Sequence, residues 1–140
     1  MPFFKFQAVV FDFDGVIVGA GGHLYRDTLH LIRSLYGNVP LHIASAANHS
    51  DLLRVCSQLG IFEYFVSIHG GPTPKYQLLS QLLLEYGYTA EATCLIGDSY
   101  SDYEAALHNG MQFFGYSNEA LRDLSGSSGW FQSFPMLTLT

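Results

Sequence analysis

Acidic side chains follow apolar runs of this chain at two places. Asp12 and Asp14 follow the first apolar run, and Asp98 and Asp102 follow a later one. Carboxylates that come close together repel one another, and burial adds to the cost of their charge. A divalent cation removes this conflict, and Mg²⁺ prefers hard oxygen ligands of this kind. If the two runs are strands that end at the same edge of a sheet, the four aspartates predict a magnesium site.

Two further side chains stand at comparable places and could act with the acids. Ser45 ends another apolar run, and Lys75 begins the helix expected after the third strand. A single aspartate after a strand is usually a turn residue or a helix cap. Without a functional site, each of these residues would need a separate structural role of this kind. The set as a whole therefore favours a functional site.

Short apolar runs alternate with amphipathic stretches, and these elements must position the side chains. Buried strands are expected at residues 8–13, 41–44, 64–68, 93–96 and 112–115. Helices are expected at residues 24–36, 50–59, 74–87 and 101–110. The tail from residue 117 predicts a short helix, a Ser/Gly turn at 125–129 and a short strand around Trp130.

Two of the helices carry start signals in the sequence. Thr73 offers a hydroxyl cap, with Pro74 in the first helical position. Ser101 and Glu104 have the spacing of a capping box.

The alternation of strands and helices predicts the α/β class. We expect one Rossmann-like domain over residues 1–140, with a mainly parallel five-stranded sheet flanked by helices. In such folds the ligand site lies beyond the carboxyl ends of the strands, where the strand order reverses. The acids, Ser45 and Lys75 all fall at such ends.

At this point the sequence resembles the haloacid dehalogenase-like (HAD) hydrolases over nearly its whole length. Residues 11–16, Phe-Asp-Phe-Asp-Gly-Val, resemble the first motif of that family. Ser45 and Lys75 match the second and third motifs, and residues 96–106 resemble the fourth. The chain departs from the family where Tyr76 replaces the proline that frequently follows the lysine.

The resemblance implies roles for the four aspartates. Asp12 would be the nucleophile that forms an aspartyl-phosphate. Asp14 would be the general acid and base, and its main-chain carbonyl would help to hold Mg²⁺. Asp98 would be a direct or water-linked metal ligand, and Asp102 a supporting carboxylate of the metal site.

The resemblance also implies a phosphate-binding set. Ser45 would donate a hydrogen bond to a phosphate oxygen, and Lys75 would balance the charge of the nucleophile and the phosphate. The main-chain amides of Ala46 and Ala47 could help, because helix starts attract anions. Charge neutralisation and positioning supply most of the catalysis in phosphoryl transfer.

The implied activity is that of a Mg²⁺-dependent phosphatase acting on a small phosphorylated substrate. The dehalogenase members lack an aspartate at the position of Asp14, so this residue favours phosphate chemistry. Two alternatives remain open: a phosphomutase, which must shield its intermediate from water, and a non-catalytic scaffold or assembly protein that keeps the fold.

The sequence leaves no room for a cap domain. The intervals from Asp14 to Ser45 and from Ser45 to Lys75 are each filled by one helix and one strand. Residues 16–23, rich in glycine, would form only a small flap over the site. Water must then be excluded by another subunit or by a large substrate. The aromatic content of 15% favours a homo-oligomer, and Tyr76, Tyr100 and Tyr103 are expected to pack.

The composition excludes several classes of protein. The net charge of −6 with six basic residues argues against nucleic-acid binding. No apolar run has the length of a membrane span. Cys56 and Cys94 are expected to be buried thiols in a reducing compartment, which makes a cytoplasmic location the default.

Other site classes fit the sequence less well. Residues 19–24 match half of a dinucleotide-binding fingerprint, but Leu24 stands where the last glycine is needed. A phosphoacceptor receiver domain would carry its aspartate after the third strand, where residues 67–69 contain no acid. The six histidines lack ligand spacing and are expected at the surface or at helix ends, with His23 a candidate for substrate contact.

Overall fold

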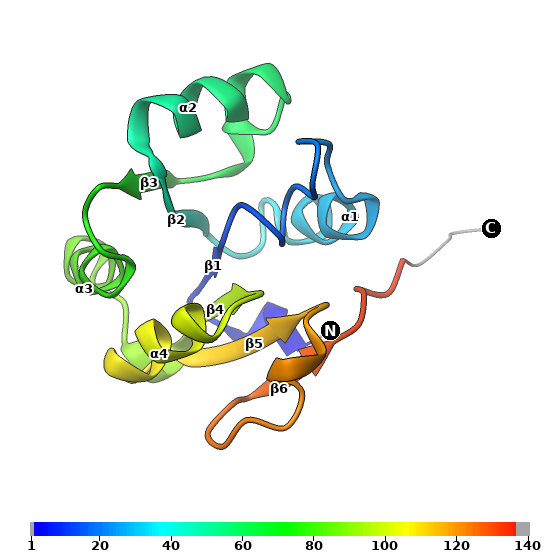
Figure 1. Cartoon of the computed structure of the whole chain (residues 1–140). Coiled ribbons are helices and arrows are strands. Elements are labelled where there is room, and N and C mark those ends of the chain that lie inside the picture. Colours follow the sequence, from blue (N-terminus) through cyan, green and yellow to red (C-terminus); the bar gives the residue numbers. More distant parts are fainter. Residues whose placement is uncertain (1, 137–140) are drawn as a thin grey trace.

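Six parallel strands form one sheet in the computed structural model, which describes residues 2–136 (Figure 1). Their order across the sheet is β3-β2-β1-β4-β5-β6. The strands are β1 (Ala8–Phe11), β2 (Leu41–Asn48), β3 (Ser67–Gly71), β4 (Thr93–Gly97), β5 (Gln112–Tyr116) and β6 (Gly129–Phe131).

The helices cover both faces of this sheet, as the strand–helix alternation predicts. The α-helices are α1 (Arg26–Leu35), α2 (His49–Gln58), α3 (Lys75–Tyr86) and α4 (Tyr100–His108). Short 3₁₀ helices are η1 (Pro2–Lys5), η2 (Phe62–Tyr64), η3 (Ala90–Ala92) and η4 (Glu119–Leu121). Figure 1 shows α3 and α4 on one side of the sheet and α1 on the other.

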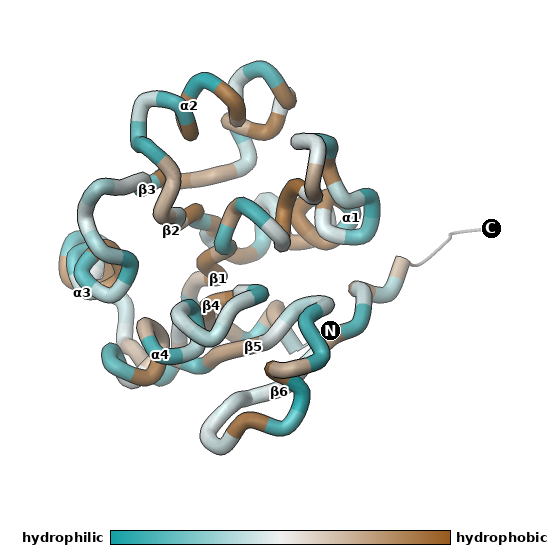
Figure 2. The backbone as a smooth tube through the Cα atoms, in the orientation of Figure 1, coloured by the Kyte–Doolittle hydropathy of each residue, from teal (hydrophilic) through white to brown (hydrophobic). Residues whose placement is uncertain are grey.

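The core has two layers because successive strand residues point to opposite faces. Val9 and Phe11 of β1 pack with the buried side chains of α1 and α2. Val10, between them, packs with α3 and α4. All four residues of β1 are buried, which explains its continuous apolar sequence. Figure 2 shows hydrophobic residues along β1 and alternating hydropathy along the helices.

The topology brings the loops after β1 and β4 together. The chain moves from β1 outward to β2 and β3, then returns to place β4 on the other side of β1. Phe11 is in register with Ile43 of β2 and with Ile96 of β4. The residues that follow these three positions therefore meet at one edge of the sheet, at the reversal of strand order.

The predicted fold class is confirmed, with differences at the ends of the elements. The short strand expected around Trp130 is present as β6, and its pairing with β5 gives the sheet six strands rather than five. The third strand begins at Ser67 rather than at residue 64, because residues 62–64 form η2. The second strand continues to Asn48, where a register shift against β3 keeps the chain extended.

Both predicted helix starts are wrong in detail. Pro74 itself is the N-cap of α3, and no side chain caps this helix. The capping box of α4 is formed by Ser99 and Asp102, not by Ser101 and Glu104. Both pairs have the same spacing in the sequence. The pair Ser99 and Asp102 forms the capping box because it also closes the loop after β4.

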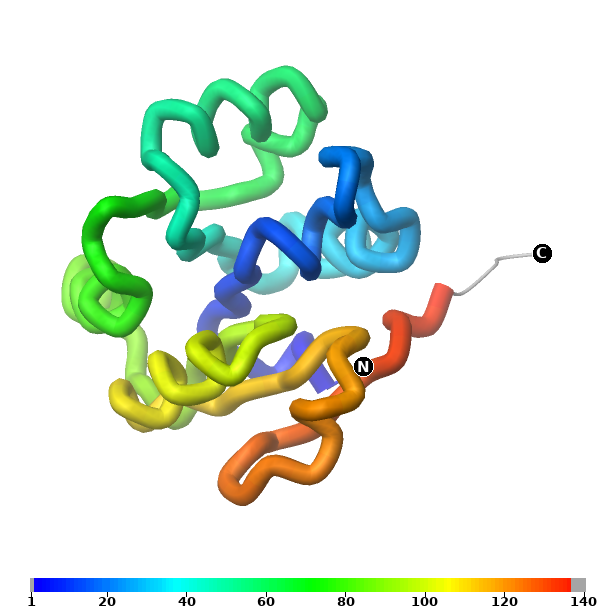
Figure 3. Tube along the Cα trace, viewed as in Figure 1, coloured from blue at the N-terminus to red at the C-terminus, as the bar shows by residue number. Residues whose placement is uncertain are grey.

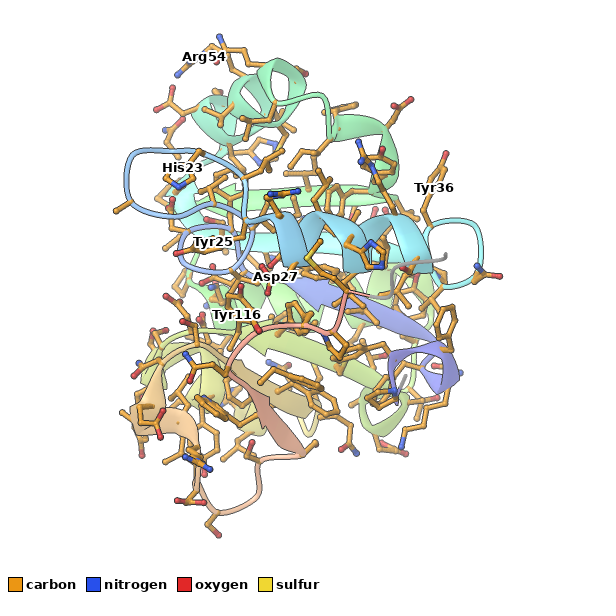
Figure 4. The ribbon with its side chains drawn as sticks, turned by 90° about the vertical axis from the view of Figure 1, so that its right-hand side faces the viewer. His23, Tyr25, Asp27, Tyr36, Arg54 and Tyr116 are labelled. Carbon is orange, nitrogen blue, oxygen red and sulfur yellow. The ribbon has the colours of Figure 1, made fainter. Side chains whose placement is uncertain are left out.

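Aromatic side chains tie the two ends of the described chain together. The ring centroid of Phe3 lies 5.0 Å from that of Phe114 and 5.6 Å from that of Phe131. Figure 3 shows the N-terminal segment beside the segment that follows β6. Tyr116 donates a hydrogen bond to Asp27, which also accepts one from the main-chain N–H of Phe134 (Figure 4). Part of the aromatic excess is therefore used inside the domain.

Two expectations about buried groups have opposite outcomes. Cys56 and Cys94 are both buried and free, as expected. The placement of all six histidines at the surface or at helix ends is wrong for His42, which lies fully buried in β2. Its ring bonds to Ser67 and Tyr88, which satisfies both nitrogens. Among residues 2–136, no helix has both the length and the apolarity to cross a membrane.

Candidate active site

The loop after β1 places Asp12 at the centre of the sheet edge. Its main-chain N–H donates to the carbonyl of Ile96 at 2.9 Å, which extends the pairing of β1 with β4 by one residue. The residue is only 7% exposed. Directly after it, the carbonyl of Phe13 accepts hydrogen bonds from the N–H groups of residues 16–18, so the chain turns sharply.

Gly15 allows the loops after β1 and β4 to approach each other. A Cβ atom at this position would lie 1.8 Å from the Oδ2 of Asp98, and the residue has a φ of +84°. Any side chain here would displace the Asp98 carboxylate and strain the turn. Asn118, from the segment after β5, donates its side-chain N–H to the carbonyl of Asp98 at 2.9 Å and holds the loop from the far side.

Asp102 joins the loop after β4 to helix α4. Its Oδ2 accepts hydrogen bonds from the main-chain N–H groups of Asp98 and Ser99 at 3.2 and 3.3 Å. The hydroxyl of Ser99 accepts from the N–H of Asp102 in return. Gly97 makes this packing possible, since a Cβ there would lie 2.5 Å from the Cβ of Asp102. Asp102 is thus a buried, multiply bonded carboxylate.

Lys75 brings the only cation of the cluster from the start of α3. Its Nζ donates to Asp12 Oδ1 at 2.7 Å and also to Asp102 Oδ1. A positive charge at a helix N-terminus is opposed by the helix dipole. The two carboxylates offset this cost by pairing with the ammonium.

Burial and charge pull the ionisation of the cluster in opposite directions. Burial raises the pKa of Asp12 well above its usual value, although Lys75 acts against this. Burial likewise raises the pKa of Asp98. Burial alone would lower the pKa of Lys75, but the attraction of Asp12 and Asp102 outweighs it and raises that pKa. The cluster therefore has more carboxyl groups than its one ammonium can neutralise.

The donor set fits a hard divalent cation. Asp12, Asp98 and Asp102 each offer a carboxylate oxygen, and these oxygens all lie within 4.8 Å of one another. Three carboxylates face one ammonium, and Asp98 has no cationic partner among residues 2–136. Oxygen ligands and excess negative charge are the conditions in which Mg²⁺ binds.

Ser45 lies at the same edge of the sheet as the acids, two residues after Ile43 of β2, and the backbone orients its hydroxyl. It is 2% exposed, and its Oγ accepts a hydrogen bond from the N–H of Ala47 at 3.1 Å. The hydroxyl hydrogen thus remains able to donate to a phosphate oxygen. The expected role of Ala47 is not supported, because its N–H points to Ser45. Ala46 and Ala47 also belong to β2 rather than to a helix start, since α2 begins at His49.

Asp14 lies outside the group of carboxylates and is exposed. It sits at the tip of the turn after β1, next to the N–H of Gly15, which donates to the carbonyl of Val18 at 2.8 Å. The expected flap at residues 16–23 is wrong in its first part, because residues 16–18 are buried in the core. Residues 20–23 are exposed, and His23 lies on this loop (Figure 4).

The structure adds residues that the sequence did not single out. Gly15, Gly97 and Asn118 shape the meeting of the loops, and their spacing within the motifs was the available signal for the two glycines. Tyr76 and Tyr100 pack against the rings of His108 and Tyr103, as expected, but remain 40% and 56% exposed. Tyr103 is buried, as expected.

Comparisons with known proteins bear on the family and the fold of the chain. The family model for haloacid dehalogenase-like hydrolases matches residues 20–110, a range that includes Ser45, Lys75 and Asp98. No curated protein sequence matches the chain. A hydrolase of the haloacid dehalogenase-like family from Streptococcus pneumoniae is 17% identical, with a TM-score of 0.75 over 83% of this chain and 89% of that chain.

Two further solved structures cover more of the chain. A HAD-superfamily hydrolase from Ehrlichia chaffeensis has a TM-score of 0.75 and 15% identity over 93% of each chain. The cobalt-bound deoxy-D-mannose-octulosonate 8-phosphate phosphatase from Haemophilus influenzae has a TM-score of 0.71 and 21% identity, covering 97% of this chain and 83% of that chain. At these identities the likeness extends to the fold.

Proposed function

The chain belongs to the haloacid dehalogenase-like hydrolases, and we propose that it is a Mg²⁺-dependent phosphatase acting on a phosphate monoester through Asp12. One observation carries this proposal: a buried carboxylate oxygen of Asp12 lies 2.7 Å from the Nζ of Lys75 and beside Asp98 and Asp102. An acid at the carboxyl edge of a parallel sheet, held by a lysine and next to a cation site, is suited to attack phosphorus.

The first step transfers the phosphoryl group to the enzyme. A carboxylate oxygen of Asp12 forms a bond to phosphorus while the bond from phosphorus to the ester oxygen breaks. Asp14 donates a proton to the departing oxygen, which leaves as an alcohol. The exposed position of Asp14 at the turn suits this role, because it can exchange its proton with water.

The second step regenerates the enzyme. Asp14, now a carboxylate, takes a proton from a water molecule while the oxygen of that water attacks phosphorus. The bond between phosphorus and the Asp12 oxygen breaks, and inorganic phosphate is released. The same residue serves as acid and then as base, so the cycle ends with both aspartates in their starting state.

The neighbouring side chains supply charge balance. Lys75 neutralises Asp12 at rest and the phosphoryl oxygens during transfer, and Ser45 donates to one of these oxygens. We assign Asp12, Asp98 and the carbonyl of Asp14 to hold Mg²⁺, with Asp102 orienting Lys75 and the loop. When bound, Mg²⁺ shields the phosphoryl oxygens from the surrounding carboxylates.

The open site favours hydrolysis over phosphate transfer between substrates. A phosphomutase must keep water from its phosphorylated intermediate. The intervals from Asp14 to Ser45 and from Ser45 to Lys75 each hold one α-helix, together with strands of the sheet and no additional cap. Residues 20–23 of the loop are exposed. A second copy of the chain covering the site remains part of the proposal, although the internal aromatic packing weakens the argument from composition.

Turnover of p-nitrophenyl phosphate tests the proposal. We expect release of p-nitrophenol with Mg²⁺ present, loss of the activity with EDTA, and recovery when Mg²⁺ is restored. Asp12→Asn and Asp14→Asn should both abolish turnover, whereas Asp51→Asn on the exposed surface of α2 should leave it unchanged. Activity that survives in Asp12→Asn would refute the assignment. No turnover of any phosphate ester and no bound metal would favour a non-catalytic scaffold.

A further inference from the structure

A cleft of about 460 Å³ opens between helices α3 and α4, directly beside the catalytic cluster. Lys75 and Tyr76 line it from α3, Glu104 and His108 line it from α4, and Ala46 lies at the sheet edge. The volume falls within the usual range of small-molecule sites. None of the roles assigned above uses this cleft beyond Lys75 and Ala46.

Lys75 connects the cleft to the reacting atoms. The same side chain that lines the cleft donates to Asp12 at 2.7 Å. Ala46 follows Ser45, the proposed phosphate donor. A phosphoryl group placed on Asp12 would thus lie next to the inner end of the cleft, and the rest of the substrate could extend along α4.

Glu104 gives the cleft a negative charge away from Lys75. Its side chain is exposed, and it forms no ion pair with any lysine or arginine of residues 2–136. Ala105, on the next position of α4, presents only a methyl group to the cleft. A ligand group that reaches Glu104 therefore meets a carboxylate without a competing internal cation.

Tyr76 provides an aromatic wall near this carboxylate. The side chain is 40% exposed, and its ring packs edge-on against His108 with 4.9 Å between ring centroids. Asn109 donates to the main-chain carbonyl of Tyr76 at 3.0 Å, which ties the two helices together here. An aromatic ring next to a carboxylate is a favourable environment for an organic cation.

A substrate with an acidic leaving group fits this cleft poorly. Lys75 is the one lysine or arginine among the described lining residues, and its Nζ is already shared by Asp12 and Asp102. A second carboxylate would face Glu104 without a partner, whereas an ammonium would be attracted to it.

We propose that this cleft binds the leaving group of the substrate and selects phosphate esters of amino alcohols. In this arrangement the phosphate lies at Asp12 and Lys75, and the protonated amine lies between the Glu104 carboxylate and the Tyr76 ring. The inference rests on the proposed phosphatase activity and extends it to a substrate class.

Three matched esters test the inference: 3-aminopropyl, n-butyl and 3-carboxypropyl phosphate, which differ only in an ammonium, a methyl and a carboxylate end group. We expect kcat/KM at pH 8 to fall in that order. Because the contact with Glu104 is partly exposed, Glu104→Gln should lower the preference for the amine over the butyl ester by about threefold. In the same variant, turnover of the carboxylate ester should rise relative to that of the butyl ester.

Two further variants separate the cleft from general charge effects. Glu91→Gln removes an exposed carboxylate from η3, outside the cleft, and should leave all three ratios unchanged. Tyr76→Leu should also reduce the amine preference, whereas Tyr76→Phe should retain it. Turnover without discrimination, or with preference for the carboxylate, would overturn the inference and leave the phosphatase activity standing. Protein that hydrolyses p-nitrophenyl phosphate but none of the three esters would overturn the inference alone, whereas failure on p-nitrophenyl phosphate as well would overturn both.

Discussion

Two buried polar clusters lie on the same sheet, at opposite ends of its strands. At the carboxyl end, Asp12 and its neighbours place three carboxylates around one ammonium. At the other end, near the starts of β2 and β3, His42 forms a neutral network. Its Nδ1 lies 2.6 Å from the hydroxyl of Ser67, and its Nε2 lies 2.8 Å from that of Tyr88.

The two clusters differ in whether their own residues satisfy their hydrogen bonds and neutralise their charges. A consistent set of donors runs from Tyr88 to His42, then to Ser67 and on to His69. Burial lowers the pKa of His42 to about 4, so the network is neutral at physiological pH. The acidic cluster has three carboxyl groups for one ammonium, and no other described lysine or arginine pairs with them. A closed network stabilises the fold, whereas an open one requires a ligand.

The largest expected effect separates activity from stability at the acidic cluster. Asp12→Asn should reduce turnover of p-nitrophenyl phosphate by at least about 1,000-fold. The free energy of unfolding without Mg²⁺ should stay the same or rise, since one of the repelling carboxylates is removed. Steady-state kinetics and urea unfolding check the two parts. A large loss of stability would mean that this cluster is structural, like the one around His42.

Removal of the ammonium should damage both properties. Lys75→Met leaves Asp12 and Asp102 buried without a counter-charge, and breaking such a pair costs about 3 kcal/mol. Turnover should fall about 100-fold. Because Mg²⁺ supplies positive charge to the same carboxylates, it should raise the melting temperature of Lys75→Met more than that of the unchanged protein. Equal shifts in calorimetry would argue against a shared site.

The opposite pattern is expected at the neutral network. His42→Leu removes the partner of Ser67 and Tyr88 and should cost about 2 kcal/mol of unfolding free energy. The variant should keep its kcat and its affinity for Mg²⁺, since His42 lies at the far end of the strands. Denaturant unfolding and kinetics on the folded protein measure both. Loss of Mg²⁺ binding in this variant would show that the two clusters are coupled.

The network should also respond to pH in a defined direction. Above pH 6.5 the imidazole of His42 is neutral in both the folded and the unfolded chain, so its contribution is complete. Between pH 6.5 and about 4, the unfolded chain binds a proton that the folded chain rejects, and the free energy of unfolding falls by about 3 kcal/mol. Over this range, the free energy of unfolding plotted against pH should have a steeper slope for the unchanged protein than for His42→Leu. Identical slopes would contradict the burial of a neutral imidazole.

The smallest effect is expected at exposed charges, which serve as the reference for both clusters. Arg54 points from α2 into solvent (Figure 4) and pairs with Asp51 at 3.4 Å. Arg54→Ala should change the free energy of unfolding by less than about 0.5 kcal/mol and leave turnover intact. A larger change in thermal unfolding would show that exposed charges also support the fold.

The strand-end acids could be predicted because buried parallel strands leave a clear apolar pattern. Lys75 was also recognisable, because it begins the helix expected after the third strand and matches the third motif of the family. The motifs identified these site residues but gave no distances between their side chains. The closeness of Asp12 to Asp102 depends on how β1 and β4 pair, which the order of elements alone does not fix.

Other features escaped the sequence because they depend on tertiary packing. His42 reads as a polar residue near a strand start, and only the packing of α3 and β3 against it shows that it is buried. The choice between two overlapping capping boxes in residues 99–104 depends on the loop that Asp102 closes. The cleft at Tyr76 and Glu104 arises from two helices that are distant in sequence.

Direct chemical trapping of the phosphorylated enzyme tests the central claim. Protein mixed with Mg²⁺ and p-nitrophenyl phosphate is quenched and treated with borohydride, which reduces an aspartyl-phosphate to homoserine with loss of the phosphate. Peptide mass spectrometry should find the conversion at Asp12, at no other aspartate, and only when both substrate and Mg²⁺ are present. Active protein that shows no conversion, or conversion at Asp14 or Asp98 in place of Asp12, would contradict the account.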